Sequence, residues 1–140
     1  MRAVIDTNVV VSGLIRESST PGRVLAAWME RRFTIVTSEP LLEELERVLG
    51  YSRIFKHLGW DDERRVAYIS RLRQRAEIVR PVRRLTVVSD DPDDDRVIEA
   101  AVAGRADYIV SGDAHLLTVQ RFEAVQIVTP AAFLPVLDAD

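Results

Sequence analysis

Four acidic residues occupy positions that could bring their carboxylates together. Asp6 directly follows an apolar run at the start of the chain, and Asp113 follows a later apolar run after one glycine. Glu44 lies in the first turns of one expected helix, and Asp95 lies at the start of another. Unpaired carboxylates repel one another, and burial strengthens the repulsion. Such a cluster persists when a divalent cation neutralises it, and the cation can then activate water and stabilise charge on a phosphate.

The composition restricts which metal such a site could hold. The chain has no cysteine and only two histidines, His57 and His115, which excludes thiolate zinc sites and a cysteine nucleophile. The ligands must therefore be mainly oxygen atoms, which indicates Mg²⁺ or Mn²⁺ rather than zinc. His115, two residues after Asp113, could touch a phosphate or a metal. A histidine in such a place is more often a partly exposed helix residue, and metal-acidified water needs no histidine base.

Each acid taken alone also has a structural explanation. Asp6 could form a turn, Glu44 lies in a charged run typical of a solvated helix face, and Asp113 could cap the helix that follows it. Asp95 lies at the start of an expected helix, where an aspartate can cap the helix or stabilise its dipole. The same explanation applies to the nearby Asp91, Asp93 and Asp94. The combined placement, rather than any single acid, supports the metal-site hypothesis.

The elements that must position these acids follow from the apolar pattern. Strands are expected at 2–5, 33–37, 108–111 and 125–128, with 76–79 favoured over 85–88 as a further strand. Helices are expected at 20–29, from a Ser38 cap to Gly50, and at 62–75, 93–104, 114–119 and from Pro130. Continuous apolar strands that alternate with helices favour a parallel sheet covered on both faces. The prediction is a single domain over 1–140, a Rossmann-like three-layer α/β/α fold, in which ligands bind beyond the carboxyl ends of the strands.

Bulk properties limit the class of protein. No apolar run approaches the roughly 20 residues that a membrane span needs, and the acid at position 6 comes too early for a signal peptide, so we expect a cytoplasmic protein. The net charge of −3 argues weakly against nucleic-acid binding, but arginines concentrate between residues 64 and 84. Arg64, Tyr68, Arg71 and Arg75 share one helical face by their spacing. That face could contact RNA, receive an acidic protein segment, or simply be solvated.

Four stretches, taken together, resemble the motifs of the PIN-domain family, and within it the VapC-like toxins. They are 4–9 (VIDTNV), 38–45 (SEPLLEEL), 91–101 (DPDDDRVIEAA) and 106–113 (ADYIVSGD), and the resemblance covers nearly the whole chain. In the second motif the acid directly before the leucine is usually the functional one, which selects Glu44 over Glu43. In the third, placing Ile98 on the apolar helix position of the family selects Asp95.

The resemblance implies roles for these residues. Asp6, Glu44, Asp95 and Asp113 would be the catalytic acids and the metal ligands. Asp91, Asp94, Asn8 and Ser111 would have accessory or supporting roles. The family further implies Mg²⁺ or Mn²⁺ as the cofactor, cleavage of single-stranded RNA, frequent homodimers and, for toxins, an antitoxin that blocks the site. Arg64, Arg71 and Arg75 are the candidate RNA contacts.

Two other functions remain to be weighed. A non-catalytic or RNA-processing protein could keep the same fold and bind RNA or protein, but the presence of all four acids favours the nuclease. Phosphatases and dehalogenases that use an aspartyl nucleophile also place an aspartate after the first strand. They typically carry a second acid two residues later, where this chain has Asn8. The chain also lacks a GxxxxGK loop, which argues against nucleotide hydrolysis. The RNA target, the cut site and the identity of an antitoxin cannot be read from the sequence.

Overall fold

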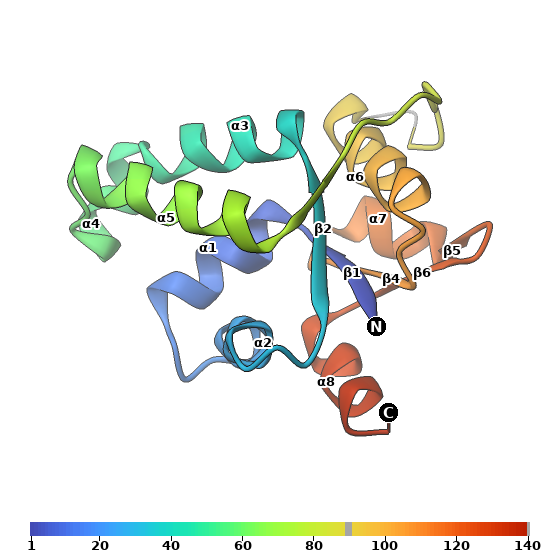
Figure 1. The fold of residues 1–140 in the computed structure, drawn as a ribbon, viewed down its shortest axis with the longest axis horizontal. Coiled ribbons are helices and arrows are strands. Elements are labelled where there is room, and N and C mark those ends of the chain that lie inside the picture. Colours follow the sequence, from blue (N-terminus) through green and yellow to red (C-terminus); the bar gives the residue numbers. More distant parts are fainter. Residues whose placement is uncertain (89–90, 140) are drawn as a thin grey trace.

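The computed structural model describes residues 1–88 and 91–139, and the chain alternates strands with helices (Figure 1). The strands are β1 Arg2–Ile5, β2 Thr34–Ser38, β3 Glu77–Val79, β4 Tyr108–Val110, β5 Arg121–Phe122 and β6 Val125–Val128. The helices are α1 Thr7–Ile15, α2 Thr20–Met29, α3 Glu39–Leu49, α4 Ser52–Leu58, α5 Asp62–Arg75, α6 Pro92–Ala103, α7 Ala114–Val119 and α8 Pro130–Asp138. Within the described part of the chain, no helix is long and apolar enough to cross a membrane.

The strands form one sheet in the order β3-β2-β1-β4-β6-β5. Every neighbouring pair is parallel except β5 and β6, which are antiparallel. From β1 the chain first builds outward through β2 and β3, and then returns to place β4 on the other side of β1. Ligands in open parallel sheets bind at the carboxyl ends of the strands where the order reverses in this way, which here is the crevice between β1 and β4.

Two apolar cores lie on opposite faces of the sheet. Side chains alternate along a strand, so Ala3 and Ile5 of β1 belong to one core, and Val4 belongs to the other. Helices α1, α2, α4, α5 and α8 contribute to the first core, while α6 and α7 contribute to the second, and α3 contributes to both. Figure 1 shows α6 and α7 on one side of the sheet and α1 to α5 on the other. The predicted α/β architecture is therefore confirmed.

Three elements were not anticipated by the apolar pattern: α1, α4 and β5. Helix α1 contains Val9, Val10 and Val11, and β-branched residues have a low intrinsic helix propensity. Those three valines are buried, so tertiary packing outweighs the local preference. The helix also contains Gly13, where an added Cβ would lie 2.7 Å from Leu25 Cδ1 and 2.9 Å from Pro21 O. The glycine thus permits α2 to pack closely against α1.

The segment 85–88 is not a strand, in agreement with the preference for 76–79, where β3 forms. Its backbone amides are bound by two acids of α6 instead of a neighbouring strand. Asp95 Oδ1 accepts from the amides of Val87 and Val88, each at 2.8 Å, and Glu99 Oε2 accepts from the amide of Leu85 at 2.7 Å. Asp95 and Glu99 are four residues apart and so share one face of the helix. These bonds fix the approach of the chain to α6.

We expect Gly13→Ala to destabilise the protein. Alanine normally stabilises an exposed helix by about 1 kcal/mol relative to glycine, but here the methyl group would press on α2, and overpacking typically costs about 1–3 kcal/mol. Urea denaturation of the variant should show a lower midpoint than wild type. Ser12→Ala, at the exposed preceding position, is the matched control. A higher midpoint for Gly13→Ala would show that the two helices have room to separate.

Candidate active site

Asp6 and Asp113 meet at the crevice between β1 and β4 through one buried hydroxyl. The amide of Asp6 donates to Val110 O at 2.9 Å, which continues the pairing of the two strands. Ser111, which is fully buried, donates its hydroxyl to Asp6 Oδ2 at 2.7 Å, and Ser111 Oγ accepts from the amide of Asp113 at 2.9 Å. Ser111 therefore fixes the side chain of one acid and the backbone of the other. This is consistent with the supporting role expected for it.

Glu44 joins Asp6 through a residue that the sequence analysis did not single out. The hydroxyl of Thr7, which is buried, donates to Glu44 Oε2 at 2.9 Å, and the amide of Thr7 donates to Asp6 Oδ1 at 2.9 Å. Thr7 thus holds the two carboxylates next to each other. Its position directly after Asp6, in the first motif, was the available signal, but only the packing of α1 against α3 shows which acid it reaches.

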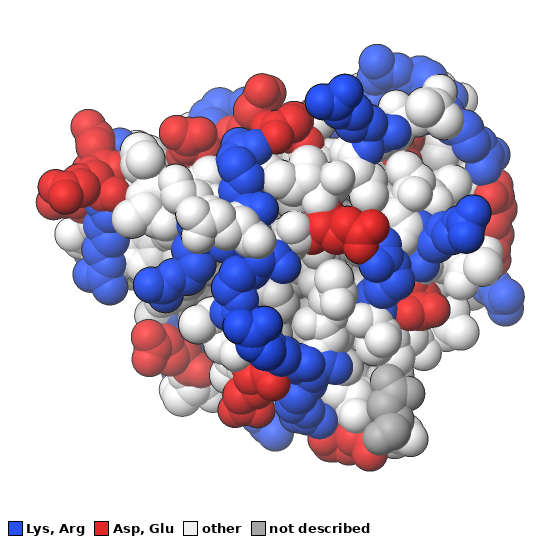
Figure 2. Space-filling view, in the orientation of Figure 1, with Lys and Arg blue, Asp and Glu red and all other residues white. Residues whose placement is uncertain are grey.

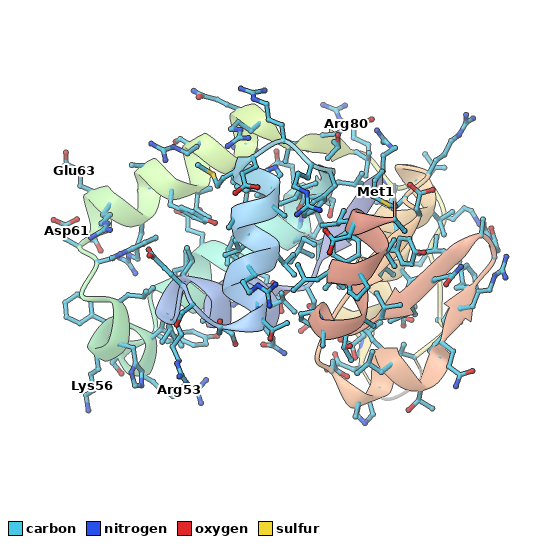
Figure 3. The ribbon with its side chains drawn as sticks, turned by 90° about the horizontal axis from the view of Figure 1, so that it is seen from below. Met1, Arg53, Lys56, Asp61, Glu63 and Arg80 are labelled. Carbon is cyan, nitrogen blue, oxygen red and sulfur yellow. The ribbon has the colours of Figure 1, made fainter. Side chains whose placement is uncertain are left out.

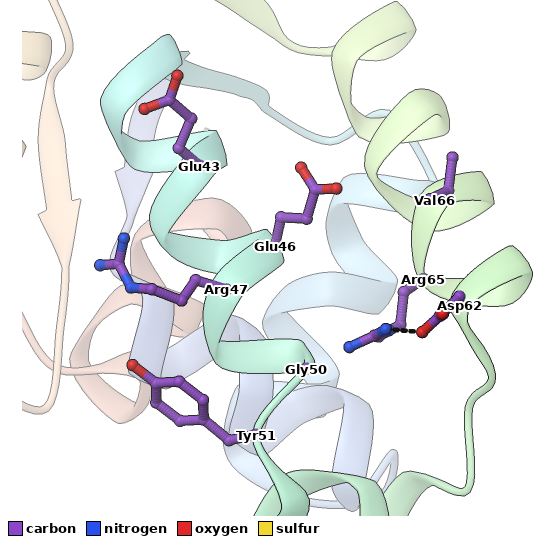
Figure 4. Close-up of a pocket in the computed structure, with 8 residues that line it drawn as sticks. All are labelled: Glu43, Glu46, Arg47, Gly50, Tyr51, Asp62, Arg65 and Val66. Atoms are coloured by element: carbon purple, nitrogen blue, oxygen red, sulfur yellow. Dashed lines mark hydrogen bonds and ion pairs between the residues drawn. The ribbon is translucent and has the colours of Figure 1, made fainter.

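The neighbour of Glu44 on α3 faces elsewhere. Glu43 lines a separate hollow of about 590 Å³ between α3 and α5, together with Glu46, Arg47 and Arg65 (Figure 4). None of the acids expected in the active site lines that hollow. The structure thus places Glu44 next to Asp6 and Glu43 in a separate hollow.

At the start of α6, the structure brings Asp94 and not Asp95 toward the other acids. The Asp95 carboxylate accepts hydrogen bonds from the amides of Val87 and Val88. Asp94 is 6% exposed, and its Oδ2 has no hydrogen-bond partner among the described residues. Asp91 caps α6 by accepting from the amide of Asp93 at 3.0 Å. The structure therefore places Asp94 beside the other acids, rather than Asp95, which the alignment of Ile98 had selected.

Asp113 caps α7, and this role is compatible with a place in the cluster. Its Oδ1 accepts from the amides of His115 at 2.7 Å and Leu116 at 3.3 Å. The side chain of His115 is exposed, and one of its ring nitrogens lies within 4.8 Å of carboxylate oxygens of Asp91 and Asp94. We use "carboxylate cluster" below for the acids that this edge of the sheet brings together, namely Asp6, Glu44, Asp91, Asp94 and Asp113.

The acids of the carboxylate cluster influence one another electrostatically. Burial raises the pKa of Asp6, hydrogen bonds from Ser111 and Thr7 lower it, and the negative charge of Asp113 raises it further. Burial also raises the pKa of Glu44, and the hydrogen bond from Thr7 lowers it.

Asp94 shows the largest effect in the cluster. Burial, together with the charges of Asp113, Asp91 and Asp6, raises its pKa to about 7, and His115 opposes this rise. A buried carboxylate oxygen without a partner is costly, and oxygen donors are the ligands that hard divalent cations prefer. The residues present therefore fit a divalent metal.

Asn8, Arg64 and Arg75, which the sequence also singled out, lie outside the carboxylate cluster. Asn8 is exposed in the first turn of α1, and it lines a hollow of about 290 Å³ that Gly112 also lines. On α5, the guanidinium of Arg64 stacks 4.7 Å over Trp60, and that of Arg75 stacks 4.6 Å over Trp28. Arg75 Nη2 also donates to Trp28 O at 3.2 Å. These contacts give both arginines a packing role in addition to their charge.

Comparisons with known proteins agree with this fold. The sequence model of the PIN domain family matches residues 2–115. An uncharacterised protein of Methanocaldococcus jannaschii is 28% identical over 120 residues, which cover 86% of this chain and 76% of that protein.

Two solved structures have a similar fold. A chain of the VapBC2 complex of Rickettsia felis, solved with a DNA fragment from its promoter, gives a TM-score of 0.59 at 16% identity, covering 91% of this chain and 97% of that one. A chain of VapBC-1 from nontypeable Haemophilus influenzae gives 0.62 at 14% identity, covering 94% and 99%.

We expect Asp94→Asn to stabilise the metal-free protein in a pH-dependent way. Because the folded pKa of Asp94 is raised to about 7, wild type binds this proton more tightly when folded. Below the unfolded pKa of about 3.9 the proton is bound in both states. As the pH rises toward 7, the unfolded chain ionises first, so wild type loses stability that Asp94→Asn keeps.

Thermal unfolding in EDTA at a series of pH values measures this difference. The gap in melting temperature between Asp94→Asn and wild type should be small near pH 4 and wide near pH 8, following the ionisation described above. Addition of Mn²⁺ should close it by stabilising wild type. Asp93→Asn removes a charge from an exposed position in the same turn and serves as the control. Parallel profiles for Asp94→Asn and wild type would contradict the prediction.

Proposed function

The chain belongs to the PIN domain family, whose members are generally nucleases, and we propose that it is a metal-dependent endoribonuclease that cleaves single-stranded RNA. The observation that supports this most strongly is the carboxylate cluster at the switch point of the sheet. It contains a buried oxygen of Asp94 that has no hydrogen-bond partner among residues 1–88 and 91–139. A protein that only bound RNA would have no use for such an oxygen, because RNA carries negative charge and repels carboxylates.

The residues proposed to hold the cation are Asp6, Glu44, Asp94 and Asp113, with Asp91 beside them. When bound, a divalent cation lowers the pKa of a coordinated water and offsets negative charge on the phosphate. The protein supplies orientation. Ser111 and Thr7 restrict the carboxylates of Asp6 and Glu44 to one geometry, so binding does not need to order these side chains. Mg²⁺ and Mn²⁺ suit this oxygen-rich set.

We predict that purified protein cleaves single-stranded RNA with Mg²⁺ or Mn²⁺ and that EDTA abolishes the cleavage. Asp6→Asn and Asp94→Asn should each lower turnover by about 100-fold or more, since loss of outer-shell partners alone often costs about 10–100-fold. Asp95→Asn is the matched control. It changes the adjacent residue of the same helix but keeps an oxygen that can accept from Val87 and Val88, so it should retain turnover close to wild type.

The pair Asp94→Asn and Asp95→Asn distinguishes two assignments of the third acid. If Asp95→Asn loses activity and Asp94→Asn keeps it, the alignment through Ile98 is correct and the revised assignment is wrong. Cleavage that survives thorough EDTA treatment would reject metal dependence. Sequencing of the cut RNA ends then identifies the preferred target.

We further propose that the nuclease is the toxin of a toxin–antitoxin pair. The structural neighbours are chains of VapBC complexes, and two adjoining hollows of about 390 and 330 Å³ offer a docking groove. Both hollows are lined by Leu14 of α1 and by Tyr68 and Arg71 of α5, and one continues to Trp28 while the other continues to Trp60. We refer to them as the α1–α5 groove.

The chemistry of the α1–α5 groove favours one kind of occupant. Its floor carries large apolar and aromatic side chains, and Arg64 and Arg71 line the hollow next to Trp60. Burial raises the pKa of Tyr68 to about 12, so its hydroxyl remains a proton donor. In Figure 2, Lys and Arg gather over the middle of the face on which α5 lies. An amphipathic helix whose acidic residues lie over the hollow next to Trp60 fits this surface, as a segment of an acidic antitoxin would, while the hollow next to Trp28 is lined by Glu17 and Glu30.

We predict that Arg71→Glu weakens binding of the antitoxin encoded by the adjacent gene by about 100-fold, because like charges across an interface cost several kcal/mol. Co-purification followed by calorimetric titration measures the change. Arg53→Glu reverses a charge on α4 (Figure 3), at a residue that lines neither of the two hollows, and should leave binding unchanged. Unaltered antitoxin binding with reduced RNA cleavage would instead assign Arg71 to the RNA. Light scattering of the same samples tests the expected homodimer.

A further inference from the structure

We propose that His115 is a metal ligand which, with Asp94 and Asp91, forms a mixed nitrogen–oxygen site selective for transition-metal ions such as Mn²⁺ over Mg²⁺. The inference rests on the proposed function, because it refines which cation the carboxylate cluster holds. It assigns to His115 a contact that the four-acid pattern of the sequence does not include. The sequence analysis favoured an ordinary exposed position for this residue.

The geometry brings three potential ligand atoms together from two helices. One ring nitrogen of His115 and one oxygen each of Asp91 and Asp94 all lie within 4.8 Å of one another. Ligands about 2.1 Å from a common ion lie about 3 Å apart when they are adjacent and about 4.2 Å apart when they are opposite, so the three atoms would move closer by about an ångström or more where they lie at the 4.8 Å limit. His115 is exposed, and its side chain therefore has room to make that shift.

The backbone around the three residues is fixed by the cluster itself. Asp113 accepts from the amide of His115 and so sets where α7 begins. Asp91 and Asp94 are three residues apart at the start of α6, which places them on the same face. One oxygen of Asp91 accepts from the amide of Asp93, and a carboxylate has a second oxygen that can coordinate a cation. The positions of all three ligands thus follow from helix starts rather than from flexible loops.

Asp94 supplies an independent indication that a ligand belongs here. Only 6% of its surface is exposed, and its Oδ2 contacts no hydrogen-bond donor in the part of the chain that the structure describes. Buried polar atoms in proteins nearly always have a partner. The charges of Asp113, Asp91 and Asp6 raise the pKa of Asp94, and His115 lowers it. A cation coordinated by Asp94 and His115 would satisfy this oxygen.

The donor set determines the metal preference. Mg²⁺ requires near-octahedral oxygen coordination and retains its waters, whereas imidazole nitrogen suits transition-metal ions, and carboxylate oxygen also suits Mn²⁺. Removal of the imidazole should therefore reduce the affinity for Mn²⁺ more than the affinity for Mg²⁺. An acidic site without histidine would respond to both ions alike.

Pulsed electron paramagnetic resonance of the Mn²⁺-loaded protein tests the coordination directly, because a bound imidazole nitrogen modulates the echo. The chain has only two histidines, so His57→Ala is the matched control for His115→Ala. Wild type and His57→Ala should show the nitrogen signal, and His115→Ala should lose it. Titration should show the Mn²⁺ affinity of His115→Ala reduced by about tenfold or more, with the Mg²⁺ affinity changed much less.

The outcomes separate this inference from the proposed function. If Mn²⁺ binds and RNA is cleaved, but no imidazole signal appears or His115→Ala keeps it, His115 is not a ligand and the nuclease proposal stands. Equal losses of Mn²⁺ and Mg²⁺ affinity in His115→Ala would overturn the selectivity. If no divalent ion binds to wild type, both the inference and the proposed metal dependence fail. Melting temperatures of the metal-free variants show whether each one is folded.

Discussion

Repulsion among buried carboxylates is the constraint on which the rest of this structure depends. Three aspartates of the carboxylate cluster sit at the starts of helices: Asp6 at α1, Asp91 at α6 and Asp113 at α7. Each accepts from amides of its own helix, and a helix start carries partial positive charge. Three helices therefore converge with their amino ends on one edge of the sheet and offset part of the negative charge. No amide of the described residues donates to Oδ2 of Asp94, and the pKa of Asp94 is raised more than that of any other acid in the cluster.

Capping and ligand binding are compatible roles here. Sequence reasoning weighed a capping aspartate against a functional one, but each carboxylate has two oxygens. In Asp6, Oδ1 accepts from Thr7 while Oδ2 accepts from Ser111. In Asp113, Oδ1 accepts both amide bonds of α7, and the second oxygen can face the cluster. The same hydrogen bonds that start the helices thus hold the acids in position.

The sequence was sufficient for most of the sheet because continuous apolar runs mark buried strands. It was insufficient for α1, where burial overrides the low helix propensity of Val9, Val10 and Val11. It also selected Asp95 as the third acid, whereas the structure places Asp94 with the other acids. Adjacent helix residues point about 100° apart, so Asp94 and Asp95 face different neighbours. Only the three-dimensional structure shows that the 85–88 segment occupies Asp95 and leaves Asp94 for the cluster.

The bond between Ser111 and Asp6 joins residues 105 positions apart in the chain, and β4 must insert beside β1 before it can form. Protein synthesis proceeds at roughly 5–20 residues per second from the amino end. Asp6 and Glu44 therefore leave the ribosome well before the acids of α6 and Asp113. A chain still being translated therefore cannot assemble the complete acidic site, and the proposed RNA cleavage would begin only after Asp113 has left the ribosome.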